Sequence, residues 1–209
     1  MSPPEYYLPA ENEEAFHDMM SAWRRLDRSE LPCTVHPLKP GDRVQLAKTR
    51  WVNVFRAVHR VPTIGYALGR TVRKLKPEYI GLPGKEIGAR IQAGEDLHDV
   101  VDVNDLAFCG DTTIDVVKRE AIVRTARVLI LEVTFLDDRI SPERARRQGH
   151  IHLEDVVANA ELFENEAILF THFSRRYSTR QIREILQDRL PPTLLERCQP
   201  LPLGPPWET

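Results

Sequence analysis

Hydrophobic positions switch along the chain between helical and strand-like spacing. In residues 13–26 apolar side chains recur every three or four positions, which predicts an amphipathic helix packed on the core. Its apolar stripe consists of Ala15, Phe16, Met19, Met20, Trp23 and Leu26. Short runs rich in β-branched and aromatic residues predict strands at residues 5–8, 34–38, 43–46, 51–55 and 63–68.

The second half of the chain alternates strands with helices. Apolar runs predict buried strands at residues 106–109, 128–131 and 167–170. Helical patterns lie at residues 116–123, 142–148, 153–163 and 179–190. This alternation predicts a layered α/β domain over residues 1–199, followed by a Pro-rich tail at residues 200–209. Residues 70–84 form a basic segment with Gly and Pro, for which we expect a loop.

Composition and charge exclude several classes of protein. The 209 residues carry a net charge of −2, which does not mark a nucleic-acid binder. The apolar run at residues 128–131 stops at Glu132, far short of the roughly 20 residues of a membrane span, so no membrane partner is expected. Three cysteines without a C-x-x-C pair argue against a disulfide framework or a zinc knuckle. With no visible secretory signal, we expect a cytoplasmic protein.

Polar side chains follow three of the predicted strands. Asp111, Glu132 and His172 come directly after them, and His59, His150 and His152 lie at other predicted element ends. In layered α/β folds, ligands bind outside the carboxyl ends of the strands. Each residue taken alone is as well explained as a helix cap or a loop hydrogen bond. Together they indicate a hydrolytic or metal site, because imidazole and carboxylate suit Zn²⁺, Mn²⁺ or Fe²⁺.

Five segments resemble one enzyme family, in the family's order. Residues 108–112 (F-C-G-D-T) resemble the strand-end G-D-T of the metallo-β-lactamase fold, and residues 131–135 (L-E-V-T-F) resemble the H-E-A-T-F of ribonuclease Z. Residues 149–152 (G-H-I-H) stand where that family has G-H-S-T. Residues 169–177 (L-F-T-H-F-S-R-R-Y) and 58–66 (V-H-R-V-P-T-I-G-Y) resemble its L-x-L-T-H-F-S-x-R-Y and H-x-V-P-S-x-G-Y. The resemblance covers residues 6–190 and implies a metallo-β-lactamase-like αββα sandwich that hydrolyses phosphodiesters at tRNA 3′ ends.

The resemblance also implies roles for individual residues. In that family two metal ions, usually zinc, activate the water that attacks the phosphodiester; Mn²⁺ is the alternative ion. By resemblance, His59 and His172 would each ligate one ion and Asp111 would bridge both. His150 would donate a proton or stabilise charge, oriented by Glu132. The residues implied to contact substrate phosphate are Ser174, Arg176 and Tyr177.

Other positions depart from the family. Its H-x-H-x-D-H signature is absent, since only His150 and His152 are two positions apart and no Asp-His follows them. We therefore expect an N-terminally truncated domain that holds one ion or none and is impaired in activity. Only 52 positions separate His59 from Asp111 (111 − 59), which predicts no long protruding arm of the kind that family members use to grip tRNA.

Three functions remain open from the sequence. The first is a phosphodiesterase of the ribonuclease Z type, with precursor tRNA as substrate. The second is a hydrolase of the same fold that acts on a small ester or phosphate, favoured by the near-neutral charge and by the expected lack of an arm. The third is a non-catalytic truncated domain. A strand edge left open by truncation would favour association, so a homodimer is expected.

Overall fold

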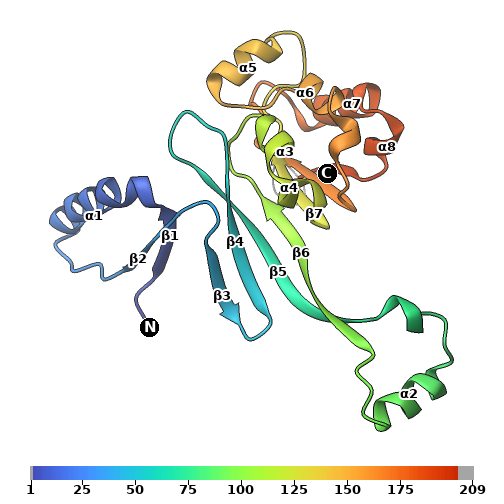
Figure 1. Ribbon diagram of the computed structural model, residues 1–209. Helices are drawn as coiled ribbons and strands as arrows, with labels where there is room; N and C mark the ends of the chain where they lie inside the picture. Colours follow the sequence, from blue (N-terminus) through green and yellow to red (C-terminus); the bar gives the residue numbers. More distant parts are fainter. Residues whose placement is uncertain (1, 202–209) are drawn as a thin grey trace.

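The computed structural model describes residues 2–201, and within them the strands form one seven-stranded and one two-stranded sheet. In the larger sheet β3 to β6 are antiparallel neighbours, while β6 to β9 run parallel (Figure 1). The strands are β3 (Arg43–Ala47), β4 (Arg50–Arg56), β5 (Ile64–Leu75), β6 (His98–Phe108), β7 (Val128–Glu132), β8 (Ala167–Thr171) and β9 (Cys198–Pro200). The parallel order brings the carboxyl ends of β6, β7 and β8 to one edge, and the expected mixed α/β fold is confirmed.

Short helices connect and cover the parallel strands. They are α3 (Asp115–Arg119), α4 (Ala121–Thr125), α5 (Pro142–Gln148), α6 (Leu153–Val157), α7 (Thr179–Arg189) and α8 (Pro192–Leu195). Ser178 begins α7 with a capping box to Gln181, and Ser141 caps α5, which has Pro142 in its first turn. No helix among residues 2–201 combines the length and apolar character needed to cross a bilayer.

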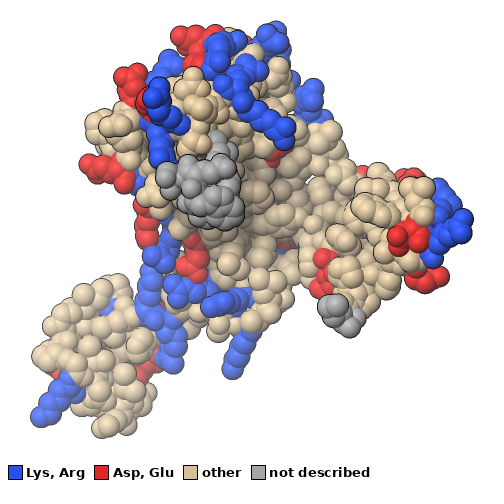
Figure 2. Space-filling view, turned by 180° about the vertical axis from the view of Figure 1, so that it is seen from behind, with Lys and Arg blue, Asp and Glu red and all other residues tan. Residues whose placement is uncertain are grey.

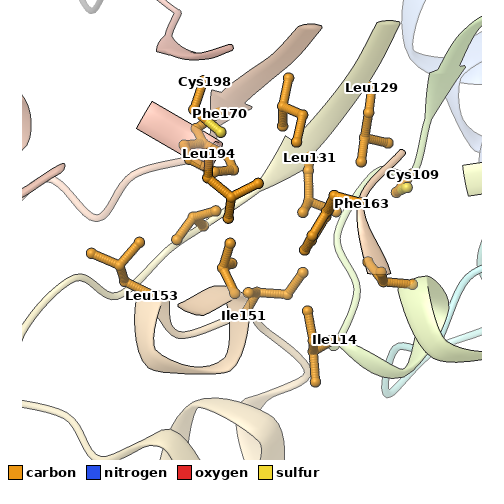
Figure 3. Close-up of a cluster of buried hydrophobic side chains, with 14 of the residues drawn as sticks. Cys109, Ile114, Leu129, Leu131, Ile151, Leu153, Phe163, Phe170, Leu194 and Cys198 are labelled. Carbon is orange, nitrogen blue, oxygen red and sulfur yellow. The ribbon is translucent and has the colours of Figure 1, made fainter. Parts of the chain in front are cut away.

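The main core lies between the parallel strands and these helices. Leu129 and Leu131 of β7 are fully buried, as are Ile168 and Phe170 of β8 (Figure 3). Burial alternates along β7: Leu129 and Leu131 on one face are fully buried, whereas Val128 and Ile130 on the other face are only partly buried. The residue that ends β7, Glu132, is thereby held on a rigid element.

We call residues 5–38 the N-terminal unit; in it β1 (Glu5–Pro9) and β2 (Thr34–Leu38) pair in parallel, and α1 (Glu13–Asp27) connects them. The unit packs on the large sheet through Leu38, which is buried against Val54 and Ile64. The prediction that α1 packs on a core is wrong. Of its 15 residues, all of them described, only Met20 is buried, while Met19, Trp23 and Leu26 are 48%, 57% and 85% exposed. Two strands offer too narrow a surface to cover the stripe of a four-turn helix.

The predictions of a basic loop and of no protruding arm are also wrong. Strands β5 and β6 stay paired from Arg70↔Val103 out to Leu75↔His98, and the hairpin projects well beyond the body of the molecule (Figure 1). At its tip lie a 3₁₀ turn (Pro77–Tyr79) and α2 (Gly84–Gln92). We call residues 70–103 the arm. The two strands of the arm are hydrogen-bonded to each other but do not pack against a core. Their sequences therefore lack a clear alternation of apolar and polar residues.

Candidate metal centre

Three side chains with metal-binding atoms meet at the carboxyl ends of the parallel strands. Asp111 follows β6, His172 follows β8 and His150 follows α5; one ligand atom from each lies within 4.8 Å of the others. His172 Nε2 is 3.5 Å from Asp111 Oδ1, and the rings of His150 and His172 stack with centroids 5.2 Å apart. Asp111 and His172 are both more than 40% exposed, so an ion or a substrate can reach them.

His59 lies beside this group. It follows β4, and its ring centroid is 5.4 Å from that of His150. Two hydrogen bonds fix its loop to the segment after Asp111: Val58 N–H donates to Thr112 Oγ1 (2.9 Å), and Thr113 N–H donates to the Val58 carbonyl (2.9 Å). Of the predicted set, Asp111 and His172 share the cluster with His150, while His59 lies outside it, next to His150.

Gly149 is required for this arrangement. Its φ is +86°, a left-handed conformation that ends α5, and a Cβ there would lie 2.4 Å from His59 Nδ1. The missing side chain lets His59 Nδ1 donate to the Gly149 carbonyl at 2.9 Å. A carbonyl oxygen only accepts, so Nδ1 carries the hydrogen and Nε2 keeps its lone pair in the neutral ring.

A single buried carboxylate organises the other two imidazoles. Glu132 is 1% exposed, and it accepts hydrogen bonds from Thr112 N (3.2 Å), Thr134 N (3.1 Å), Thr134 Oγ1 (2.7 Å) and His150 Nδ1 (2.8 Å). Four donors are what a buried carboxylate needs to remain stable away from water. The hydrogen bond to Glu132 is the largest cause of a pKa of His150 above its ordinary 6.5, and partial burial opposes it.

Thr134 links the buried carboxylate of Glu132 to the imidazole of His172. The threonine hydroxyl has one hydrogen, which goes to Glu132, so its oxygen accepts from His172 Nδ1 at 2.9 Å. His172 is therefore left with a free Nε2, the atom that faces Asp111. A metal-binding histidine typically donates its other ring N–H to a protein oxygen, as His59 and His172 do. The donor set and these supporting contacts fit a divalent ion.

The three predicted phosphate-binding residues fall into two groups. Arg176 donates from Nε to Ser174 Oγ (3.0 Å), and its guanidinium lies 5.6 Å from the Phe135 ring, which contacts His150 edge-on. Tyr177, by contrast, is 5% exposed; its hydroxyl accepts from Leu136 N and donates to Asp137 Oδ1. It anchors the loop after β7, a placement that favours a structural role over a phosphate contact.

Sequence reasoning missed two further contributors. Thr112 and Thr134 are buried and hold Glu132, although both stand inside the G-D-T and E-V-T-F segments that carry the resemblance. The sequence feature that could have identified them is a threonine one or two positions after a carboxylate at the end of a strand. His152, another candidate from its position, is buried; its Nδ1 accepts from Glu154 N at the start of α6, so it caps a helix.

Known proteins with related sequences include two tRNase Z enzymes of Arabidopsis thaliana; no family model matches. The chain is 40% identical to tRNase Z TRZ1 over 206 residues, which are 98% of this chain and 73% of that protein. It is 33% identical to the chloroplastic tRNase Z TRZ2 over 186 residues, 88% of this chain and 52% of that protein. The chain thus spans only part of the length of these relatives.

Solved structures share the fold. The short form of human tRNase Z superposes with a TM-score of 0.53 at 23% identity, covering 85% of this chain and 64% of that one. A metallo-β-lactamase-fold protein of Bacillus subtilis gives 0.52 at 12% identity, over 89% and 59%. These neighbours confirm the metallo-β-lactamase fold, and with the 40% identity to TRZ1 they show that the chain belongs to the tRNase Z family.

Proposed function

We propose that this chain hydrolyses a phosphodiester bond of a precursor tRNA in tRNA 3′-end processing. The observation that carries the proposal is the meeting of Asp111, His150 and His172 within 4.8 Å, supported by the buried Glu132. The family name of its relatives supplies the substrate class.

Asp111 and His172 would hold a divalent ion, with His59 completing the set from the other side of His150. Zn²⁺ is the expected ion and Mn²⁺ the alternative, because both accept imidazole and carboxylate. Such an ion supplies Lewis acidity and lowers the pKa of a water molecule to about 7.

The chain's own residues divide the remaining work. His150 is suited to donate a proton to the leaving oxygen, because Glu132 favours its protonated form and a protonated imidazole cannot ligate a metal. Its partner Glu132 holds the ring in one orientation. Ser174 and Arg176, next to His172 in sequence, would bind non-bridging phosphate oxygens.

The arm favours RNA over a small substrate. The alternative of a small ester or phosphate drew support from a missing arm, and the structure shows an arm. A small ester bound at Asp111, His150 and His172 would not extend as far as the arm, whereas a folded RNA extends far beyond the scissile bond.

Cleavage assays distinguish the three functions. A precursor tRNA with a 3′ trailer and a bis-aryl phosphodiester are compared with and without Zn²⁺ or Mn²⁺. We expect metal-dependent trailer removal, lowered at least roughly 100-fold in His172→Ala. His17→Ala, which removes an exposed histidine of α1, is the matched control and should be unaffected. Activity on the bis-aryl phosphodiester alone would favour the hydrolase of a small ester or phosphate. Cleavage of neither substrate would favour the non-catalytic domain.

Metal content gives an independent check. The 209 residues contain no H-x-H-x-D-H segment, so we expect one ion or none per chain, and slow turnover by this chain alone. Two tightly held ions per chain would contradict that expectation. His150→Gln separates the two roles open to this residue: a proton donor can be lost without losing the ion, whereas a ligand cannot.

A homodimer and a cytoplasmic location stay predictions. Exposed Met19, Trp23 and Leu26 on α1 support self-association, because together they form an apolar surface on one helix. Light scattering of the purified chain tests the dimer, and a monomer at micromolar concentration would contradict it.

A further inference from the structure

The two segments that carry His150 and His172 are rich in arginine. Residues 139–151 contain four arginines and one acidic residue, and residues 172–183 contain four arginines and no acidic residue. The segments meet at the site, because the rings of the two histidines are 5.2 Å apart. Figure 2 shows Lys and Arg side chains gathered over the end of the molecule that carries α5 to α7.

The arginines of α5 are of two kinds. Arg146 turns inward, where it pairs with Asp155, a largely buried carboxylate, and with Glu143. Arg144 and Arg147 are exposed, and neither forms an ion pair with any of residues 2–201. They are three positions apart on the helix and so lie on the same face.

A third exposed arginine follows His172. Arg175 lies in the loop between β8 and α7 and forms no ion pair within the described part of the chain. Its neighbour Arg176 is positioned over Phe135 beside His150. We call Arg144, Arg147 and Arg175 the arginine rim.

Local stability does not account for the rim. A cation in the last turn of a helix interacts with the helix dipole by about 0.3–1 kcal/mol, which covers Arg147 alone. Arg144 and Arg175 gain nothing from it, and unpaired like charges repel one another. Guanidinium groups bind phosphate in a bidentate geometry, so exposed arginines a few residues from His150 and His172 suit a polyanion that reaches the site.

We infer that the arginine rim binds the ribose–phosphate backbone of RNA beside the scissile bond. The inference rests on the proposed function and adds three residues, Arg144, Arg147 and Arg175, to the phosphate contacts proposed for Ser174 and Arg176. The chain's net charge of −2 gives no general attraction to RNA, so binding has to come from local groups of this kind.

Binding measurements without turnover test the inference. A fluorescent RNA hairpin with a single-stranded 3′ extension is titrated with the chain in EDTA, between about 50 and 200 mM salt. For the double variant R144Q/R147Q we expect roughly tenfold weaker binding, and a log–log salt slope smaller by about 1–2, because two phosphate contacts are lost. R144K/R147K keeps both charges and should recover the slope while remaining weaker than the unaltered chain.

The matched control is R25Q/K48Q, which removes two positive charges, as R144Q/R147Q does. Arg25 on α1 and Lys48 between β3 and β4 are exposed and lie on other elements, so this variant should bind within about twofold of the unaltered chain. Unchanged binding by R144Q/R147Q, or an equal loss in the control, would overturn the inference alone. An unaltered chain that binds no RNA would overturn the proposed function and the inference with it.

Discussion

The layer around β7 and the N-terminal unit differ in how their sequences use apolar residues. Around β7, Leu129, Leu131 and Phe170 are completely buried. Glu132, which ends the strand, accepts hydrogen bonds from four donor atoms. In the N-terminal unit, the helix α1 buries one residue and leaves Trp23 57% exposed. The site is therefore built on the part of the chain that holds the main hydrophobic core.

This difference shows what positions the catalytic groups. Asp111, Glu132 and His172 follow strands that lie side by side in register, and no residue of the N-terminal unit contributes to the cluster of ligand atoms found among residues 2–201. Changes near β7 should thus disturb both stability and the site, whereas changes on the exposed face of α1 should disturb neither.

The largest effect is expected at Glu132. Glu132→Ala leaves four buried donors without their acceptor, and the free energy of unfolding should fall by about 3–5 kcal/mol. Urea denaturation measures it. Glu132→Gln, which keeps the shape and one acceptor oxygen, should lose less. Equal stability of the alanine variant and the unaltered chain would show that this network is not formed.

A pair of core truncations compares the two regions directly. Leu129→Ala removes a fully buried side chain of β7 and should cost about 3 kcal/mol, because it leaves a cavity that the tight core cannot fill. Met20→Ala in α1 should cost about 1 kcal/mol, since its surroundings are open. The same urea experiment applies to both, and a reversed order would refute the comparison.

Thr134→Val tests the link between the carboxylate and His172. Loss of the hydroxyl leaves His172 Nδ1 without its acceptor, and we expect metal affinity to fall by about tenfold and stability by about 1–2 kcal/mol. Calorimetric titration with Zn²⁺ reports the affinity. Thr134→Ser restores the hydroxyl and should recover most of it; a serine variant as weak as the valine one would argue against the link.

The smallest effect is expected on α1. Trp23→Ser replaces an exposed ring, and in a sample dilute enough to be monomeric the free energy of unfolding should change by no more than about 0.5 kcal/mol. A loss comparable to that of Leu129→Ala would mean that a partner surface covers this ring in solution.

Much of the fold was predictable, for identifiable physical reasons. The strands at β7 and β8 and the helices α5 and α7 were expected close to their observed bounds, because buried apolar runs, Ser caps and Pro stops are local signals. The arm was not, since its strands pair with each other away from any core and so carry no burial pattern. The exposure of α1 was missed because a sequence shows an apolar stripe but not what covers it.

The site was predictable to the level of residue identity and no further. The strand-end positions of Asp111, Glu132 and His172 indicated that they would meet, and the structure places them together. The inward direction of the Tyr177 hydroxyl and the bridge through Thr134 depend on side-chain geometry that spacing does not encode.

The central claim is that Asp111 and His172 hold a divalent ion, and its most direct test is anomalous diffraction at the zinc edge from crystals grown with Zn²⁺. We predict a peak about 2.0–2.2 Å from a carboxylate oxygen of Asp111 and from Nε2 of His172. Bound zinc found only at other residues, or no peak at this site at saturating Zn²⁺, would contradict the account.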